Sequence, residues 1–321
     1  MSAELRQARS PSGPLAPDGL LLADKGPDVT SFHVVAHLRR LLRVPKVGHG
    51  GTLDPMATGL LPILLGEATK LTAHLQGQDK EYLATIRLGI DTDTLDATGA
   101  TTRERTVPPL TDGDVRAVLA RFVGDIDQLP PMYSALHAGG RRLHELARAG
   151  IAVERSPRRV RVYAFELIEC ASPRLRVRVR CGSGTYVRSL AADVGETLGC
   201  GGHVERLVRT RVGSLRLEDA VPWTAIQAGD LATLAAGVLP SDRAVGHLPA
   251  VHVSAESGRR LGHGQRVPPS EVHGAELPAV GAACRVYDDA SFLGIGEVSP
   301  DGLRPLRLLH ADRPRPRPVS P

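Results

Sequence analysis

The strictest pattern in the sequence is the alternation of residues 174–181, where every second side chain is an arginine and the others are apolar. A period of two is that of a β-strand, whose successive side chains point to opposite faces of a sheet. The chain must therefore form a sheet with a covered apolar face. The guanidiniums on the other face repel one another unless they meet solvent, carboxylates or phosphates. The two faces are Leu175, Val177, Val179 and Cys181, and Arg174, Arg176, Arg178 and Arg180.

Other segments with strand or helix periodicity interleave irregularly along the chain, without a regular βαβ rhythm. This order predicts an α/β mixed (α+β) fold, with a largely antiparallel sheet flanked by helices. The predicted strands are residues 19–23, 82–88, 133–137, 159–168 and 174–181, and the predicted helices are 31–42, 67–75, 111–123, 141–149 and 186–198, with a helical stretch at 222–245.

The chain has 321 residues, which favours two domains over one. Its 42% hydrophobic and 23% charged residues are typical of a soluble globular protein. Near residue 249 the composition changes to short apolar runs between Gly- and Pro-containing turns, which predicts a small β-rich domain. We expect a flexible leader at 1–17, a main domain at 18–248, the β-rich domain at 249–312 and a disordered tail at 313–321.

Charge is concentrated in the segment 141–188, which holds twelve arginines and four acids, a local charge of +8. The whole chain carries +5, so the remainder carries 5 − 8 = −3. A basic segment on a nearly neutral body indicates a polyanionic partner, and nucleic acid is the commonest. The alternative is compositional, because the chain has 36 Arg and 4 Lys and uses arginine as its general cation.

Several classes of protein are disfavoured. No apolar run reaches the roughly 20 residues that span a bilayer, and the leader has no signal-peptide core. The four cysteines are scattered without C-x-x-C spacing, so neither a zinc site nor a disulfide framework is indicated. We therefore expect a cytoplasmic protein with reduced thiols, no metal, no cofactor and no membrane contact.

One carboxylate, Asp54, lies in a Gly-rich loop that reads His-Gly-Gly-Thr-Leu-Asp over residues 49–54 and continues with Pro55. Glycines let the backbone approach a ligand closely, and proline disfavours a helix at the residue before it. An aspartate before proline is usually a turn residue. Whether Asp54 is catalytic therefore depends on the rest of the chain.

Motifs on both sides of this loop, taken together, resemble the TruB family of pseudouridine synthases, which modify the T-loop uridine of tRNA. They run in family order over roughly residues 19–220, and residues 249–310 are similar to the family's PUA-like RNA-binding domain. The matching segments are Gly19–Ser31, Val47–Gly59, Lys80–Tyr82, Leu88–Gly89, Thr92–Asp96, Pro131–Ala135, Gly184–Arg188 and Gly199–Gly213.

The resemblance implies the catalytic residues. Asp54 matches the family's catalytic aspartate, Arg188 the arginine that pairs with it, and Tyr82 the tyrosine that stacks on the base and takes part in proton transfer. The residues from 18 to 248 would then form the catalytic domain. The implied reaction converts the uridine at tRNA position 55 to pseudouridine without a cofactor.

The resemblance also implies residues that bind the substrate. Tyr186 and Leu207 match the walls of the base pocket, and His49 matches a histidine that packs where the base leaves its stack. Lys25 matches a lysine that supports the loop or contacts a phosphate. The sequence departs from the family pattern next to Lys25, because it reads Asp-Lys-Gly-Pro-Asp over residues 24–28.

The reaction itself requires few catalytic groups. The C1′–N1 bond of uridine must break, the base must turn and C5 must join C1′, through a sugar that is oxocarbenium-like as in glycoside cleavage. One carboxylate suffices, either as a nucleophile at C1′ or as a stabiliser of its positive charge. A uridine in a folded loop must also be flipped out of its stack.

Other readings stay open at this stage. The chain could be a tRNA-binding or tRNA-folding protein whose isomerase activity is dispensable, or a guide-RNA-dependent synthase of the dyskerin type. A glycoside hydrolase would need a second carboxylate, which the sequence does not place near Asp54 but folding could. The expected partner is the T-arm of tRNA, bound by a monomer.

Overall fold

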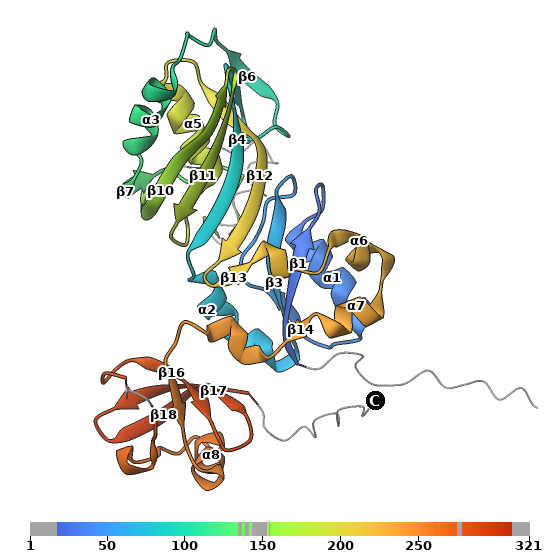
Figure 1. The fold of residues 1–321 in the computed structure, drawn as a ribbon, viewed down its shortest axis with the longest axis vertical. Helices are drawn as coiled ribbons and strands as arrows, with labels where there is room; N and C mark the ends of the chain where they lie inside the picture. The colour runs from blue at the N-terminus through green and yellow to red at the C-terminus, as the bar shows by residue number, and fades with distance from the viewer. Residues whose placement is uncertain are drawn as a thin grey trace, which may run out of the picture.

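The computed structural model describes residues 18–133, 137–138, 141–142, 153, 155–274 and 278–309, and in these residues a long, mainly antiparallel sheet dominates (Figure 1). Its order is β14-β1-β3-β12-β4-β11-β10-β7, with β2 beside β3 and β13 beside β12. Neighbours pair antiparallel except β12 and β3, which run parallel. Its strands are β1 (Gly19–Lys25), β2 (Val47–His49), β3 (Thr58–Leu65), β4 (Lys80–Leu88), β7 (Gly124–Gln128), β10 (Arg158–Ala171), β11 (Arg174–Cys181), β12 (Gly202–Val212), β13 (Leu215–Arg216) and β14 (Val238–Leu239).

Helices pack on this sheet in two groups, at its two ends (Figure 1). Helices α3 and α5 lie against the half formed by β10, β11, β4 and β12, and α1 and α6 lie at the end formed by β1 and β3. The helices are α1 (Ser31–Leu42), α2 (Thr72–Gln76), α3 (Asp112–Ala120), α5 (Val187–Thr197), α6 (Trp223–Ala228), α7 (Leu231–Ala236) and α8 (Ala255–Gly262), with 3-10 turns η1 (Gly66–Leu71), η2 (Leu217–Asp219), η3 (Ser241–Val245) and η4 (Pro269–Glu271).

The predicted helices at 31–42 and 111–123 begin at capping side chains, and the predicted faces of the strand at 174–181 are confirmed. The Thr30 side chain accepts from the amide of His33 at the start of α1, and Thr111 and Asp114 form a reciprocal capping box on α3. The apolar side chains of β11 are buried and its arginines are exposed, as the alternation predicts. The fold class predicted from the sequence is therefore correct.

The arginine face of β11 meets carboxylates. Three of its four arginines form ion pairs, two with acids on the adjacent strand β10 and one with an acid on β12, beyond β4, at nitrogen–oxygen distances of 2.7 to 3.3 Å. Exposed pairs of this kind add little stability, but they remove the mutual repulsion that the sequence pattern implies. The pairs are Arg174 with Glu205, Arg176 with Glu169 and Arg178 with Glu166.

Three predicted elements need correction. The helix predicted from residue 141 is wrong at its start, because Arg141–Arg142 forms the short strand β9, paired with β8 (His137–Ala138). Local helix spacing there gives way to cross-strand pairing. The strand predicted at 133–137 is wrong at Tyr133, which lies in a bend, and right at His137, which belongs to β8. The helical stretch predicted at 222–245 is interrupted by β14. Residues 134–136 and 143–149, like the predicted leader and tail, lie outside the described residues.

A second, smaller sheet follows in the chain, with the order β15-β16-β17-β18. It packs on the first at few points: Ile295 joins a cluster with Leu20 and Leu64, and the Lys70 ammonium donates to the carbonyl of Leu308 at 2.9 Å. That residues 249–312 form an independent domain stays a prediction. The strands are β15 (Ala250–His252), β16 (Ala283–Tyr287), β17 (Phe292–Ser299) and β18 (Gly302–Leu308), and β5 (Ile90–Thr92) with β6 (Thr101–Glu104) forms a separate hairpin.

Across the described part of the chain, no helix combines the length and the apolar character required to cross a membrane.

Candidate active site

The loop that carries Asp54 connects β2 to β3 and is fixed at several points. The amide of Gly50 donates to the carbonyl of Pro62 at 2.8 Å, and the amide of Ala57 donates to the carbonyl of Asp54 at 3.1 Å. From α1, the hydroxyl of Ser31 donates to the carbonyl of Leu53 at 3.1 Å and accepts from the Leu53 amide at 2.9 Å. The residue before Asp54 is therefore held on both sides of its backbone.

Lys25 supports the far side of the same loop. Its side chain is fully buried, at 0% exposure, and its ammonium donates to the carbonyls of Gly26, Val29 and Pro55 at 2.8 to 3.0 Å. Burial lowers the pKa of Lys25 to about 8, and Asp54 is the first of the charges that oppose this shift. All three donors are used inside the protein, so the geometry favours loop support over a phosphate contact.

The carboxylate of Asp54 meets the guanidinium of Arg188, which projects from the first turn of α5. Nε of Arg188 lies 2.8 Å from Oδ2 of Asp54, and Nη2 donates to Oδ1 at 3.0 Å. Arg188 is only 3% exposed, whereas the Asp54 side chain keeps 31% of its surface open. One face of the carboxylate is thus paired while another stays accessible to a ligand.

Arg188 is itself held by the segments around it. Its Nη1 donates to the carbonyl of Thr94 and its Nη2 to the carbonyl of Tyr133, both at 2.8 Å. The carboxylate of Asp96 lies 3.5 Å from Nη1. Folding therefore brings a second carboxylate to the arginine, but it is buried and accepts from the hydroxyls of Thr94 and Thr98.

The charge of Asp54 is set by opposing effects. Burial is the largest and raises the pKa of the Asp54 carboxyl above the ordinary 3.8, and Asp96 adds to this. Arg188 lowers the pKa, through its charge and its hydrogen bond, and Lys25 lowers it further. The close pairing with Arg188 is made by the ionised carboxylate.

A pocket of about 130 Å³ opens between the Asp54 loop, β4, β12 and the start of α5. It is smaller than the cavities of roughly 300 Å³ or more that hold drug-sized ligands. Its size suits a single flat ring, and its walls combine aliphatic and aromatic side chains with two threonines and the Asp54–Arg188 pair. Its lining comprises Thr52, Leu53, Asp54, Tyr82, Thr185, Tyr186, Val187, Arg188 and Leu207.

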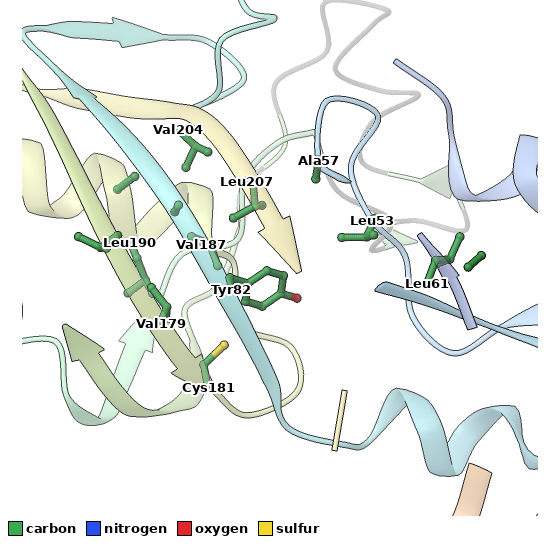
Figure 2. Packing of buried hydrophobic residues seen from close by; sticks show 14 of the residues in the cluster. Leu53, Ala57, Leu61, Tyr82, Val179, Cys181, Val187, Leu190, Val204 and Leu207 are labelled. Carbon is green, nitrogen blue, oxygen red and sulfur yellow. The ribbon is translucent and has the colours of Figure 1, made fainter. Parts of the chain in front are cut away.

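Tyr82 and Leu207 form adjacent parts of this pocket, on paired strands. Figure 2 shows the Tyr82 ring directed toward the loop that carries Leu53 and Ala57, and the pocket-lining Leu207 lies near that ring on β12. Both are largely buried, and burial raises the pKa of Tyr82, an effect that Arg209 opposes most. The hydroxyl is therefore protonated at neutral pH.

Tyr186 lies at the N-cap of α5, where its backbone is clamped from β7. The amide of Tyr186 donates to Oε1 of Gln128 at 2.7 Å, and Nε2 of Gln128 donates to the Tyr186 carbonyl at 3.0 Å. Gln128 is buried, and the sequence pattern does not indicate this contact. Its amide fixes where the helix begins, and so where Arg188 projects.

His49 lies outside the residues that line the pocket. It sits on β2, five positions before Asp54, and its Nδ1 accepts from the amide of Gly51 at 3.4 Å. Burial, helped by the charge of Arg209, lowers its pKa, so the ring is neutral at neutral pH. Of the seven residues singled out from the sequence, the pocket brings together Asp54, Tyr82, Tyr186, Arg188 and Leu207, with Lys25 and His49 beside the loop.

Arg209 was not singled out from the sequence. It lies on β12 directly opposite Tyr82 on β4 and is 1% exposed. The sequence does hold one indication of this position. Arg209 lies two residues after Leu207, so on a strand both side chains point to the same, inward face. Gln128 had no comparable signal.

Among the described residues, no group of three or more His, Cys, Asp or Glu side chains is arranged to hold a metal ion.

Solved structures with the same fold include a Cbf5-Nop10-Gar1 complex, with a TM-score of 0.67 and 27% identity over 88% of this chain and 78% of that chain. An H/ACA RNP bound to a substrate RNA containing 2′-deoxyuridine has a TM-score of 0.70 over 91% of this chain and 85% of that one, at 23% identity. The profile described as TruB family pseudouridylate synthase (N terminal domain) matches residues 39–187. The fold is thus that of the pseudouridylate synthases.

Profiles for the tRNA pseudouridylate synthase B C-terminal domain and for the C-terminal part of pseudouridine synthase II TruB match residues 188–246 and 249–309. A protein of Chromohalobacter salexigens named tRNA pseudouridine synthase B is 47% identical over 91% of this chain and 94% of its own length. Proteins of the same name from Aromatoleum aromaticum and Burkholderia pseudomallei are each 46% identical over 91% of this chain, and over 92% and 97% of their own lengths. The chain belongs to the TruB family.

Proposed function

We propose that this chain converts the T-loop uridine of tRNA, at tRNA position 55, to pseudouridine, acting without a guide RNA. The observation that carries the proposal is the accessible carboxylate of Asp54, paired with Arg188 at the edge of a pocket that fits one base. Relatives with 46–47% identity over nine tenths of the chain carry the name tRNA pseudouridine synthase B, which supports a tRNA uridine as the substrate.

In the proposed mechanism, Asp54, Tyr82 and Arg188 are the catalytic residues. The target uridine leaves its stack and enters the pocket, where Tyr82 and Leu207 provide apolar surface for the ring. The C1′–N1 bond breaks and its electron pair stays on the uracil. Asp54 attacks C1′ or stabilises its positive charge, while Arg188 keeps the carboxylate ionised and aimed.

The base then turns, and C5 forms a bond to C1′. If Asp54 is joined to C1′, that ester bond breaks and its electron pair returns to the carboxylate. The C5 proton must leave and N1 must gain a proton, so the product is an isomer of the substrate. Tyr82 is a titratable side chain that lines the pocket and is placed to take part in this transfer.

Substrate binding would extend beyond the pocket. Tyr186 and Leu207 would contact the base, and His49 would pack against the RNA beside the loop. Lys25 would act through the loop and not through the RNA, because its ammonium is buried and fully used. A catalytic domain at 18–248 and a PUA-like domain at 249–312 would both contact the tRNA, bound by a monomer in the cytoplasm.

The test is to incubate the purified protein with an unmodified tRNA transcript and map pseudouridine at single-nucleotide resolution. We expect one modified site, in the T-loop, without added guide RNA or partner protein. A transcript with cytidine at that position is the control and should stay unmodified. Binding without modification would favour the chaperone reading, and modification only with a guide RNA would favour the dyskerin-type reading.

A further inference from the structure

Arg209 joins three parts of the site that are far apart in the chain. Its Nη2 donates to the carbonyl of Gly51 at 3.0 Å, its Nη1 to the carbonyl of Thr52 at 3.2 Å and its Nε to the carbonyl of Leu60 at 2.7 Å. The first two carbonyls lie just before Asp54, and the third lies on β3 after the loop. One planar group therefore clamps both ends of the loop.

Arg209 also lies directly opposite Tyr82 on the paired strands β4 and β12, and both side chains are buried. A guanidinium can only donate hydrogen bonds, so the phenol oxygen is the only part of the Tyr82 hydroxyl that it attracts. A buried cation beside the phenol therefore favours the orientation in which the hydroxyl oxygen faces Arg209 and its hydrogen points away. Tyr82 lines the pocket, so this orientation leaves the hydrogen available to an acceptor there.

The charge of Arg209 is unusually placed. Within the described residues the buried guanidinium forms no ion pair, and its hydrogen bonds go to three backbone carbonyls. A buried cation without a carboxylate costs free energy. The stability of the fold alone therefore does not explain why an arginine occupies this buried position. Fixing the Asp54 loop through three hydrogen bonds does explain it.

The backbone of β12 at Arg209 packs tightly against the end of the Asp54 loop. A Cβ added to Gly59, whose φ is +96°, would lie 2.4 Å from the carbonyl oxygen of Arg209. The loop end at Gly59 and the strand at Arg209 are therefore in direct contact, so a shift of either one is transmitted to the other.

We propose that Arg209 is a positioning residue, which holds the segment before Asp54 against β3 and orients the Tyr82 hydroxyl toward the pocket. The carboxylate and the phenol act on the same nucleotide, and this one side chain fixes the separation between them. The expected effect of Arg209 on the reaction rate rests on the proposed function. Its expected effect on the position of the loop does not.

The kinetic test compares Arg209→Met and Arg209→Lys with the unsubstituted protein, using tRNA bound before a single turnover. We expect the rate constant to fall about 100-fold or more for Met, since a displacement of about 1 Å has this effect. Lysine keeps the charge and reaches fewer acceptors, so we expect a smaller loss. The tRNA dissociation constant should change by less than about threefold. Arg206→Met, on the exposed face of the same strand, is the control and should keep the full rate.

A second measurement does not depend on activity. Hydrogen exchange at the amides of Gly51 to Asp54 should speed up in both Arg209 variants, while exchange in the core strand β11 stays slow. Should Arg209→Met fail to fold, Arg209→Lys gives both readouts.

The effect of Arg209 on Tyr82 is tested by a double-mutant cycle with Tyr82→Phe. If Arg209 acts partly through the hydroxyl, Arg209→Lys should slow the Tyr82→Phe protein less than it slows the unsubstituted one. Unchanged rates and unchanged loop exchange in both Arg209 variants would overturn the proposal, as would equal losses of rate and tRNA affinity. If the unsubstituted protein makes no pseudouridine, the proposed function fails, and the exchange comparison still decides the role of Arg209.

Discussion

Asp54 and Arg188 are separated by 134 positions in the chain, yet two atoms of the guanidinium lie within 3.0 Å of the two carboxylate oxygens. The pair joins the loop after β2 to the first turn of α5 and borders a pocket that fits one base. Its partners leave part of the carboxylate open. The predictions below follow from this geometry and from the charges around it.

The first prediction concerns pH. Burial raises the pKa of Asp54, and the carboxylate acts only when ionised, so the single-turnover rate should rise with pH through a value above the ordinary 3.8. Arg188 favours the charged form, so in Arg188→Gln the rise of the rate should move to higher pH. Rate–pH profiles of both proteins check this. A rise that stays in place would show that Arg188 does not control the ionisation.

The second prediction concerns the phenol. Tyr82→Phe keeps the ring that covers the base, so tRNA affinity should change little. Loss of a group that transfers a proton should slow the bound reaction by roughly 10²- to 10⁴-fold. Single-turnover rates and filter binding separate the two effects, and a full rate with phenylalanine would show that the hydroxyl has no chemical role.

The third prediction concerns the arginine face of β11, where the sequence alone favoured RNA contact and solvent about equally. Because Arg176 and Arg178 are paired with Glu169 and Glu166, we expect glutamine at either position to leave the salt dependence of tRNA binding unchanged. Each phosphate contact contributes about 0.9 to the slope of log K against log salt. A slope that flattens by nearly that amount would place this face on the RNA.

The fourth prediction concerns Lys25. Lys25→Met removes three hydrogen bonds to the loop and leaves three carbonyls without their donor. We expect a loss of stability of about 1–3 kcal/mol and a slower bound reaction, with tRNA affinity nearly unchanged. Denaturant unfolding and filter binding measure the two. A loss of affinity alone would restore the phosphate-contact interpretation.

Much of the fold could be predicted because the signals are local. Strict alternation identified β4 and β11, and Thr111 with Asp114 marked the start of α3. The candidate site could be predicted where a motif carried it, as for Asp54, Tyr82 and Arg188. The pairing of Asp54 with Arg188 came from the resemblance, because no local rule links residues so distant in sequence.

The rest depends on contacts that only the folded chain creates. Arg209 donates to Gly51 from 158 positions away, and Gln128 clamps Tyr186 from 58. Each is a polar side chain at a buried position, where a period of two predicts only an apolar face. The ion pairs of β11 likewise depend on strand register, which sequence pattern alone does not supply.

The most direct test of the account is the single-turnover rate of Asp54→Asn with tRNA already bound. Asparagine keeps the size of the side chain but has no charge and is a far weaker nucleophile. We predict a rate at least about 10⁴-fold below that of the unsubstituted protein, with a tRNA dissociation constant within about threefold of it. Pseudouridine formed by Asp54→Asn at an undiminished rate, or a loss of binding as large as the loss of rate, would contradict the account.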